Sequence, residues 1–186
     1  MIRSRLATLA LTVALPLTGC GDMHADSAGP SGEGETTRAA QRLTELPSLE
    51  ATQAQLTSVV EQLGAYIATL VPGIQWRWNR EQSRSGCARP YDRTGGANLY
   101  LRNYLGDKPI PAEVWPRVVD RARELAATLG ATGAQTFRDD PGNKDARFYS
   151  PEGTAISLGY QVNTVIAADT GCRLPAGGAT SPPATR

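Results

Sequence analysis

Three cysteines and one histidine are the residues of this 186-residue chain whose side chains are best suited to chemistry. Thiolates act as nucleophiles and metal ligands, and histidine is the usual base that activates them. The cysteines are Cys20, Cys87 and Cys172, and the histidine is His24. A single histidine argues against histidine-based catalysis and against most zinc sites. We therefore expect no catalytic residue, no metal site, no cofactor and no enzymatic activity.

Cys20 follows a segment that is typical of secretory signals. Residues 1–5 include Arg3 and Arg5, and residues 6–17 form an apolar run broken only by two threonines and a proline. Twelve helical residues span about 18 Å, well short of the roughly 30 Å hydrocarbon core of a bilayer. A basic start and a short apolar run predict an exported chain rather than a membrane span.

The run Leu17-Thr18-Gly19-Cys20 resembles the lipobox of bacterial lipoproteins. That resemblance implies that residues 1–19 are a lipoprotein signal peptide and that Cys20 becomes an acylated N-terminus. Each buried CH₂ contributes about 0.8 kcal/mol, so two acyl chains anchor a protein stably. We expect the protein at the outer face of the cell membrane, attached through Cys20. An ordinary signal peptide with a coincidental cysteine is the alternative.

Cys87 and Cys172 remain as an even pair in an exported chain, where disulfides form and persist. Both follow a glycine at the end of a predicted strand, and a bridge would close a loop of 85 residues. Loop entropy sets an upper stabilisation of about 4–5 kcal/mol for such a bridge. The alternative, a nucleophilic thiol, requires a nearby base. His24 lies in a segment that we expect to be flexible, so the pattern favours a Cys87–Cys172 disulfide.

The composition predicts one globular domain between two flexible segments. Residues 20–45 are rich in Gly, Ser, Thr and acidic residues, which is typical of a lipidated tether. Residues 175–186 are rich in Pro, Gly, Ala and Thr and predict a disordered tail. The globular domain is therefore expected over residues 46–174.

Hydrophobic spacing within that domain predicts two helices and several strands. Ser48 is placed to cap a helix that ends at Val71-Pro72-Gly73, and the apolar face repeats at spacings of four and three. A second helix is expected between Pro111 and Gly130, with Pro116 in its first turn or at its start. Strands are expected from residue 74 towards Cys87, over 98–105, around 136–138 and 147–149, and over 154–158 and 163–168. This order predicts an α+β fold, with both helices on one face of a mostly antiparallel sheet.

Two further groups of residues are candidates for binding. Asp139, Asp140, Asn143 and Asp145 offer oxygen ligands, but their spacing does not match an EF-hand, so a hairpin turn is the favoured interpretation. Six arginines occur within residues 76–103, together with Trp78, Tyr91 and Tyr100. They suit an anionic glycan or a phospholipid head group, or they form a solvated sheet face. These arginines are Arg77, Arg80, Arg84, Arg89, Arg93 and Arg102.

Several short motifs resemble the LppA-like lipoproteins of mycobacteria. They are the lipobox, Trp76-Arg77-Trp78 leading to Arg84-Ser85-Gly86-Cys87, the segment from Ile110 to Pro116, and the ending from Thr170 to Pro175. The resemblance covers most of residues 1–175. It implies an envelope-anchored lipoprotein with an αβ domain, and it brings no activity, substrate or catalytic residue with it.

The charge balance and the missing motifs narrow the function. With 19 basic and 18 acidic residues the chain lacks the basic character of a nucleic-acid-binding domain. No phosphate-binding glycine motif is present, and Ser83, Ser85 and Ser150 lack a histidine partner. We expect a monomeric, non-catalytic binding or scaffolding domain at the membrane surface. The alternatives are a lipid or small-ligand carrier with a pocket between helices and sheet, and a hydrolase that uses carboxylates alone.

Overall fold

The computed structural model describes residues 31–177, which form three helices and one antiparallel sheet. The helices are α1 (Glu33–Thr44), α2 (Leu49–Leu70) and α3 (Trp115–Ala127). The strands are β1 (Trp76–Asn79), β2 (Ser83–Gly86), β3 (Ala97–Tyr100), β4 (Asn103–Gly106), β5 (Gly133–Gln135), β6 (Asp139–Asp140), β7 (Asn143–Tyr149), β8 (Thr154–Tyr160) and β9 (Thr164–Thr170). None of the helices in this range is long and apolar enough to cross a membrane.

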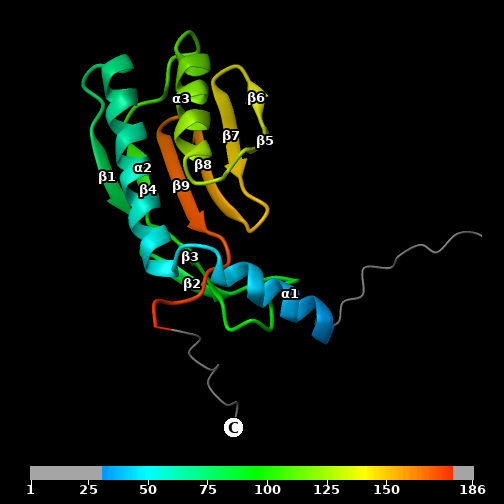
Figure 1. The fold of residues 1–186 in the computed structure, drawn as a ribbon. Coiled ribbons are helices and arrows are strands. Elements are labelled where there is room, and N and C mark those ends of the chain that lie inside the picture. The colour runs from blue at the N-terminus through cyan, green and yellow to red at the C-terminus, as the bar shows by residue number, and fades with distance from the viewer. Residues whose placement is uncertain (1–30, 178–186) are drawn as a thin grey trace, which may run out of the picture.

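The sheet has the strand order β1-β4-β9-β8-β7-β5, with β3 joining β2 to β9 and β6 pairing with β7. All of these pairings are antiparallel. Helices α2 and α3 lie side by side across one face of the sheet (Figure 1). The predicted α+β fold, with α2 and α3 on one face of an antiparallel sheet, is therefore confirmed.

Local sequence signals determine where α2 and α3 begin and end. The Ser48 hydroxyl accepts a hydrogen bond from the Ala51 N–H at 3.1 Å and caps α2. The α2 residues predicted to face the core are buried, and they are Leu56, Val60, Leu63 and Ile67. Pro116 lies in the first turn of α3, where its missing N–H costs no helical hydrogen bond. Gly130 adopts a φ of 74° just after α3, the left-handed conformation that ends a helix.

Two predicted strands are each divided in the structure. The segment towards Cys87 is interrupted at Arg80, whose φ is 66°, and β1 and β2 follow one another in the same direction, antiparallel to β4 and β3. The predicted strand 98–105 contains a β-bulge, because Tyr100 pairs with Asp169 while Tyr104 pairs with Ile166. The chain keeps β9 as its neighbour on both sides of the bulge, and it pairs with β2 and then with β1 along its other edge. Residue spacing within this segment does not reveal the extra residue.

The expected tether over residues 20–45 is wrong for residues 33–44, which form α1. Its buried residues are Ala39 and Leu43, and Leu43 lies against Gly96 beside the disulfide. At its start the Ser31 hydroxyl donates to Asp92 at 2.6 Å, and near its end Arg42 forms an ion pair with Glu152. These contacts hold a helix with only two buried apolar side chains, which composition alone did not indicate. The folded unit therefore begins at residue 31 rather than 46.

Glu152 lies at this junction with its side chain only 7% exposed. Burial by itself would raise the pKa of Glu152, but the hydrogen bond and charge of Arg42, with the backbone N–H, lower it below the usual value. At the other end of the chain the Ala176 N–H donates to Glu50 at 2.7 Å. The rest of the expected tail, residues 178–186, lies outside the described residues, as do residues 1–30 with Cys20 and His24.

The disulfide between Cys87 and Cys172 is present, with 5.5 Å between the two Cα atoms. It joins Cys87, the residue directly after β2, to Cys172 in the segment that follows β9. The expected bridge is therefore confirmed. It holds the end of the sheet next to β2 and β3 close to α1.

Candidate functional site

The face of the sheet opposite α2 and α3 carries the candidate site. Side chains alternate across a sheet, and residues directly opposite one another share a face. One row of paired residues runs Arg77, Leu105, Val165, Gly159 and Asp145 across β1, β4, β9, β8 and β7. The neighbouring row, with Trp78, Tyr104, Ile166, Leu158 and Ala146, lies under the helices. We call the first side the uncovered face, because no helix in the described part of the chain packs on it.

Two further rows complete the uncovered face. Gln135, Arg147, Ser157 and Ala167 form one of them. Gly133, Tyr149, Ala155, Asp169 and Tyr100 form the other. The middle strands β8 and β9 contribute mostly small side chains to these rows, so the surface is recessed at the centre of the face relative to its edges.

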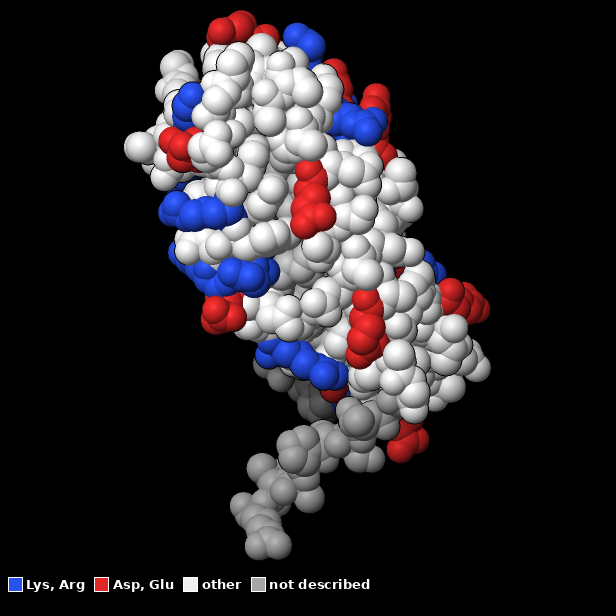
Figure 2. Space-filling view, turned by 90° about the vertical axis from the view of Figure 1, so that its left-hand side faces the viewer, with Lys and Arg blue, Asp and Glu red and all other residues white. Residues whose placement is uncertain are grey.

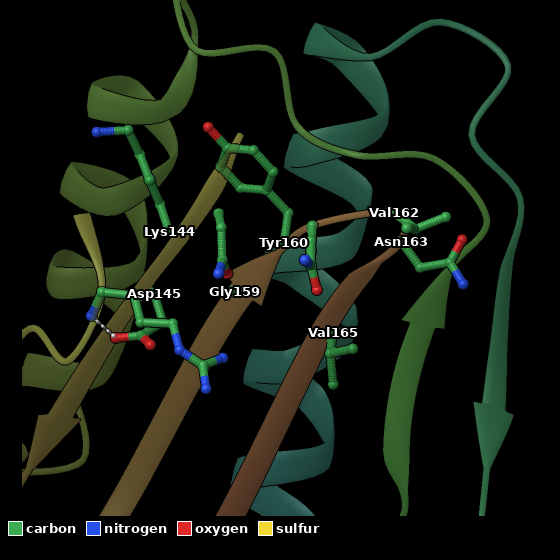
Figure 3. Close-up of a pocket in the computed structure, with 10 residues that line it drawn as sticks. Lys144, Asp145, Gly159, Tyr160, Val162, Asn163 and Val165 are labelled. Carbon is green, nitrogen blue, oxygen red and sulfur yellow. Dashed lines mark hydrogen bonds between the residues drawn. The ribbon is translucent and has the colours of Figure 1, made fainter. Parts of the chain in front are cut away.

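Two adjoining hollows lie on this face. The first has a volume of about 360 Å³ and extends from Asp145 and Gly159 to the β8–β9 turn at Val162. Figure 3 shows Gly159 and Val165 on neighbouring strands of this hollow, with Asp145 on one side and Val162 and Asn163 at its end. The second hollow, about 200 Å³, shares Asp145, Gly159 and Val165 with the first and adds Phe137 and Ala167. Together they form one shallow trough over β7, β8 and β9.

Phe137 stands at the wall of this trough with 63% of its surface exposed. Its backbone is held firmly, because Asp145 Oδ1 accepts the N–H of Phe137 at 2.8 Å and that of Arg138 at 3.2 Å. The Asp145 N–H donates in return to the Arg138 carbonyl at 3.0 Å. The strand predicted around residues 136–138 is wrong, because Phe137 lies in the loop between β5 and β6. Phe137 was not among the predicted binding residues, although a lone aromatic residue in an otherwise polar segment was a usable signal.

A polar cluster occupies the other end of the uncovered face. Arg147 donates to Asp169 at 3.3 Å and to the Ser157 hydroxyl at 3.2 Å. Burial raises the pKa of Asp169, and the nearby Arg147 offsets only part of that effect. Tyr100 pairs with Asp169 across the strands and is 46% exposed.

Asp145 and Asp169 are not arranged as the carboxylate pair that the hydrolase alternative requires. Asp145 and Asp169 share the uncovered face, but they lie two strands and four residues apart in register. Sheet spacings put their backbone positions about 16 Å from each other. Carboxylate pairs in glycosidases act across roughly 5–9.5 Å. Asp145 is also engaged by two backbone N–H groups, so these two residues lack the arrangement that acid–base catalysis requires.

The acidic segment around residue 140 forms the predicted hairpin. Asp139 pairs with Lys144 and Asp140 with Asn143 across β6 and β7. Lys144 also forms an ion pair with Asp139, and Asp145 holds the backbone of the preceding loop. Within residues 31–177 no group of three His, Cys, Asp or Glu side chains is placed to hold a metal ion.

The six arginines of residues 76–103 do not form a single site. Arg89 forms an ion pair with Glu35 of α1, Arg93 donates to the Ser31 carbonyl, and Arg102 donates to the Arg80 carbonyl. Arg77 and Arg84 lie on opposite faces of the sheet, since they pair with Leu105 and the core residue Leu99 respectively. Figure 2 shows basic side chains on the flank of the molecule that are separated by acidic and uncharged ones. The solvated and structural interpretation fits this distribution better than one anion site.

The space between helices and sheet, expected for a ligand carrier, is filled by the core. Phe148, Ile156, Leu158 and Ile166 of the sheet are almost fully buried there together with Leu63 and Val118 of the helices. The Tyr160 ring likewise packs edge-on against Trp115, with 5.2 Å between ring centroids. The two hollows described above lie on the other side of the sheet.

Comparison with known proteins identifies a family and several relatives of this chain. Residues 24–176 match the LppA family, described as a lipoprotein confined to pathogenic Mycobacterium. The chain is 29% identical to the uncharacterized lipoprotein LprP of Mycobacterium tuberculosis and of Mycobacterium bovis, over 97% of this chain and 85% of theirs.

Two crystal structures share the fold. The lipoprotein LppA of Mycobacterium tuberculosis superposes with a TM-score of 0.62 at 17% identity, over 81% of this chain and 95% of that one. A DUF4853 family protein from Actinomyces odontolyticus gives a TM-score of 0.51 at 13% identity, over 77% of each chain. The family match spans most of the sequence and nearly all of the described fold, and the chain therefore belongs to the LppA lipoprotein family.

Proposed function

We propose that this protein is a non-catalytic binding domain, held at the outer face of the cell membrane by a lipid on Cys20, and that the uncovered face is its binding surface. The anchor is supported by the lipobox Leu17-Thr18-Gly19-Cys20 and by membership of a lipoprotein family. The binding surface is supported by the geometry of the sheet.

The observation that carries the proposal is the position of the exposed apolar side chains. In the described part of the chain, four large apolar or aromatic residues are exposed, namely Tyr100, Phe137, Tyr149 and Val162. Tyr100 and Tyr149 lie in one row of the uncovered face, Phe137 lines its second hollow, and Val162 lines its first. Exposed apolar side chains gathered on one side of a soluble domain mark a docking surface.

The site is also preorganised. Two hydrogen bonds to Asp145 fix the backbone of Phe137, so that little conformational entropy is lost when its ring is covered. Small residues such as Gly159 and Ala167 keep the floor beside it open. A rigid exposed aromatic beside a hollow is the arrangement found at binding hot spots.

The test is site-specific crosslinking in a cell that exports and lipidates the chain. A photoreactive amino acid at Ala167, on the floor of the second hollow, should form an adduct with an envelope component. The same amino acid at Ala127, exposed on α3 on the other side of the sheet, should not. The Ala167 adduct should also be lost when Phe137→Ser is added. Equal adducts at both positions, or none at Ala167, would contradict the proposed binding surface.

The anchor has its own test. Cys20→Ala should abolish acylation and leave the protein in the aqueous phase after detergent partitioning. A variant that still matures at residue 20 and partitions with the detergent would rule out lipidation of Cys20.

A further inference from the structure

We infer that the uncovered face docks on the anionic surface of the membrane to which the chain is anchored. This inference rests on the proposed function and names the partner of the same surface. It follows from the spread of the apolar side chains, from the charges between them and from the length of the chain that leads to Cys20.

The exposed apolar residues are spread across the face instead of surrounding one pocket. Tyr100 and Tyr149 are separated by Ala155 and Asp169 in one row, so three strand spacings, about 14 Å, lie between their backbones. Phe137 and Val162 lie towards the opposite end, around the two hollows. A compact ligand in the trough would contact only Phe137 and Val162, whereas a planar surface can contact all four. Two of the four are tyrosines, which favour the interface between water and lipid.

The charges on this face suit an anionic surface. Arg77 lies in the row with Leu105, and Arg138 lines the first hollow. Among residues 31–177 neither arginine has a carboxylate within ion-pair distance, whereas Arg147 pairs with Asp169. Two carboxylates of the face are engaged, Asp145 by two backbone N–H groups and Asp169 by Arg147. Asp140 lies at the edge of the face, opposite Asn143, and forms no ion pair with a residue of the described range. The face therefore carries more unpaired cations than unpaired anions.

The short connection to the anchor favours the membrane over a distant partner. Only ten residues, 21–30, lie between Cys20 and Ser31, the first described residue. Even when fully extended they reach no further than about 40 Å. An attached surface within that reach acts at a high effective concentration, so a weak contact is sufficient. The shallow trough, with hollows of about 200 and 360 Å³, fits a weak and extended contact better than a deep insertion.

The experiment uses the mature chain from residue 20, whose Cys20 is the only free thiol because Cys87 and Cys172 are joined. Cys20 is coupled to a maleimide lipid in vesicles with brominated acyl chains, so the test does not depend on acylation in the cell. One set of vesicles is phosphatidylcholine alone and the other contains about 30% phosphatidylglycerol, since anionic lipid supplies the attraction for arginine. Phe137→Trp reports on the uncovered face and Ala127→Trp on α3, each read against the parent with its three tryptophans.

The added fluorescence of Phe137→Trp should fall at least about twofold in anionic vesicles, as expected for an aromatic ring at the interface, and that of Ala127→Trp should not change. Combining Phe137→Trp with Arg77→Gln and Arg138→Gln should weaken docking by about fivefold for each arginine, and high salt should weaken it further. Equal quenching of the two reporters, or quenching that ignores phosphatidylglycerol, would overturn the inference.

The crosslinking experiment in cells distinguishes a failure of the membrane-docking inference from a failure of the proposed function. If Phe137→Trp is not quenched but Ala167 still yields an adduct with a protein, the membrane is not the partner and the binding surface stands. If neither signal is seen, both proposals are wrong. A lipid adduct at Ala167 together with quenching supports both.

Discussion

The two faces of this sheet are built from the same strands, yet they differ in almost every physical property. Ile166 and Val165 are neighbours on β9, and Ile166 is fully buried under α2 and α3 whereas Val165 is half-buried on the uncovered face. The covered face is filled by large aliphatic and aromatic side chains. The uncovered face has Gly, Ala and Ser at its centre, with arginines and exposed aromatics around them.

This difference shows how one strand serves two purposes. Alternation along β7, β8 and β9 sends one set of residues to the core, where burial stabilises the fold, and the other set to solvent. The uncovered set contributes little to burial, so its exposed aromatics call for another explanation. Binding provides one, and the following predictions test whether the division between the faces holds.

The largest expected effect concerns both faces at once, because the disulfide joins the segment after β2 to the segment after β9 and so ties two parts of the same sheet together. Replacing Cys87 and Cys172 together by alanine should lower the free energy of unfolding by up to about 4–5 kcal/mol, since the bridge closes a long loop. Urea unfolding of the parent, the reduced parent and the double variant measures this. The reduced parent should match the double variant, and a double variant as stable as the oxidised parent would show that the bridge is not a structural element.

The next largest effect separates the faces directly. Ile166→Ala should lower the free energy of unfolding by about 2–5 kcal/mol, because it leaves a cavity in the core. Val165→Ala, one residue away on the same strand, should cost less than about 1 kcal/mol, since Val165 is half-buried and its surroundings can relax. Chemical denaturation of both variants makes the comparison, and similar losses would break the distinction between the faces.

A smaller effect depends on pH and belongs to the uncovered face. The pKa of Asp169 is raised by burial, so the folded protein binds this proton more tightly than the unfolded chain does. This contribution to stability is present below the unfolded pKa of about 3.8 and is lost as the pH rises through the folded value. Asp169→Asn should remove that loss, so the stability of the variant relative to the parent should increase over this pH range.

Unfolding measured at several pH values from about 3 upwards, spanning the ordinary pKa of an aspartate, follows this difference. Glu152→Gln is the matched control with the opposite sign, because the pKa of Glu152 is lowered. Its contribution is present above pH 4.5 and is lost as the pH falls through the folded value. A parent and an Asp169→Asn variant with parallel pH profiles would show that Asp169 does not titrate differently in the folded state.

The smallest effect on stability is expected at Phe137. Phe137→Ser should change the free energy of unfolding by no more than about 0.5 kcal/mol, since the ring is largely exposed and the backbone hydrogen bonds to Asp145 remain. The same variant should lose docking to anionic vesicles and the crosslink at Ala167. Thermal unfolding and vesicle binding read on one protein sample test this, and a large loss of stability would assign Phe137 to the fold instead.

Local patterns in the sequence predicted the parts of the fold that depend on local physics. The Ser48 cap and the spacing of Leu56, Val60 and Leu63 indicate α2, because capping and helical periodicity act within a few residues. The hairpin between Asp139 and Lys144 follows from its turn residues. The disulfide was predicted from the expected export and from the two cysteines that remain besides Cys20, without knowledge of any distance.

What depends on distant contacts was not predicted. Helix α1 is held by the Arg42–Glu152 ion pair and by Leu43 against the disulfide, and those partners lie far away in the sequence. The bulge between Tyr100 and Tyr104 is defined by pairing with Asp169 and Ile166 of β9, which lie far along the chain. The arginines of residues 76–103 are neighbours in the sequence, but the fold distributes them over different faces and contacts.

By itself, then, the sequence determined the fold class and the covalent cross-link, because hydrophobic periodicity and cysteine number are properties of the chain. Only the tertiary structure decided which side of each strand remains uncovered. Alternation shows that a strand has two sides, but helix packing selects the one that becomes core. That selection leaves Phe137, Tyr149 and Tyr100 exposed on one face, where three separate segments of the chain meet.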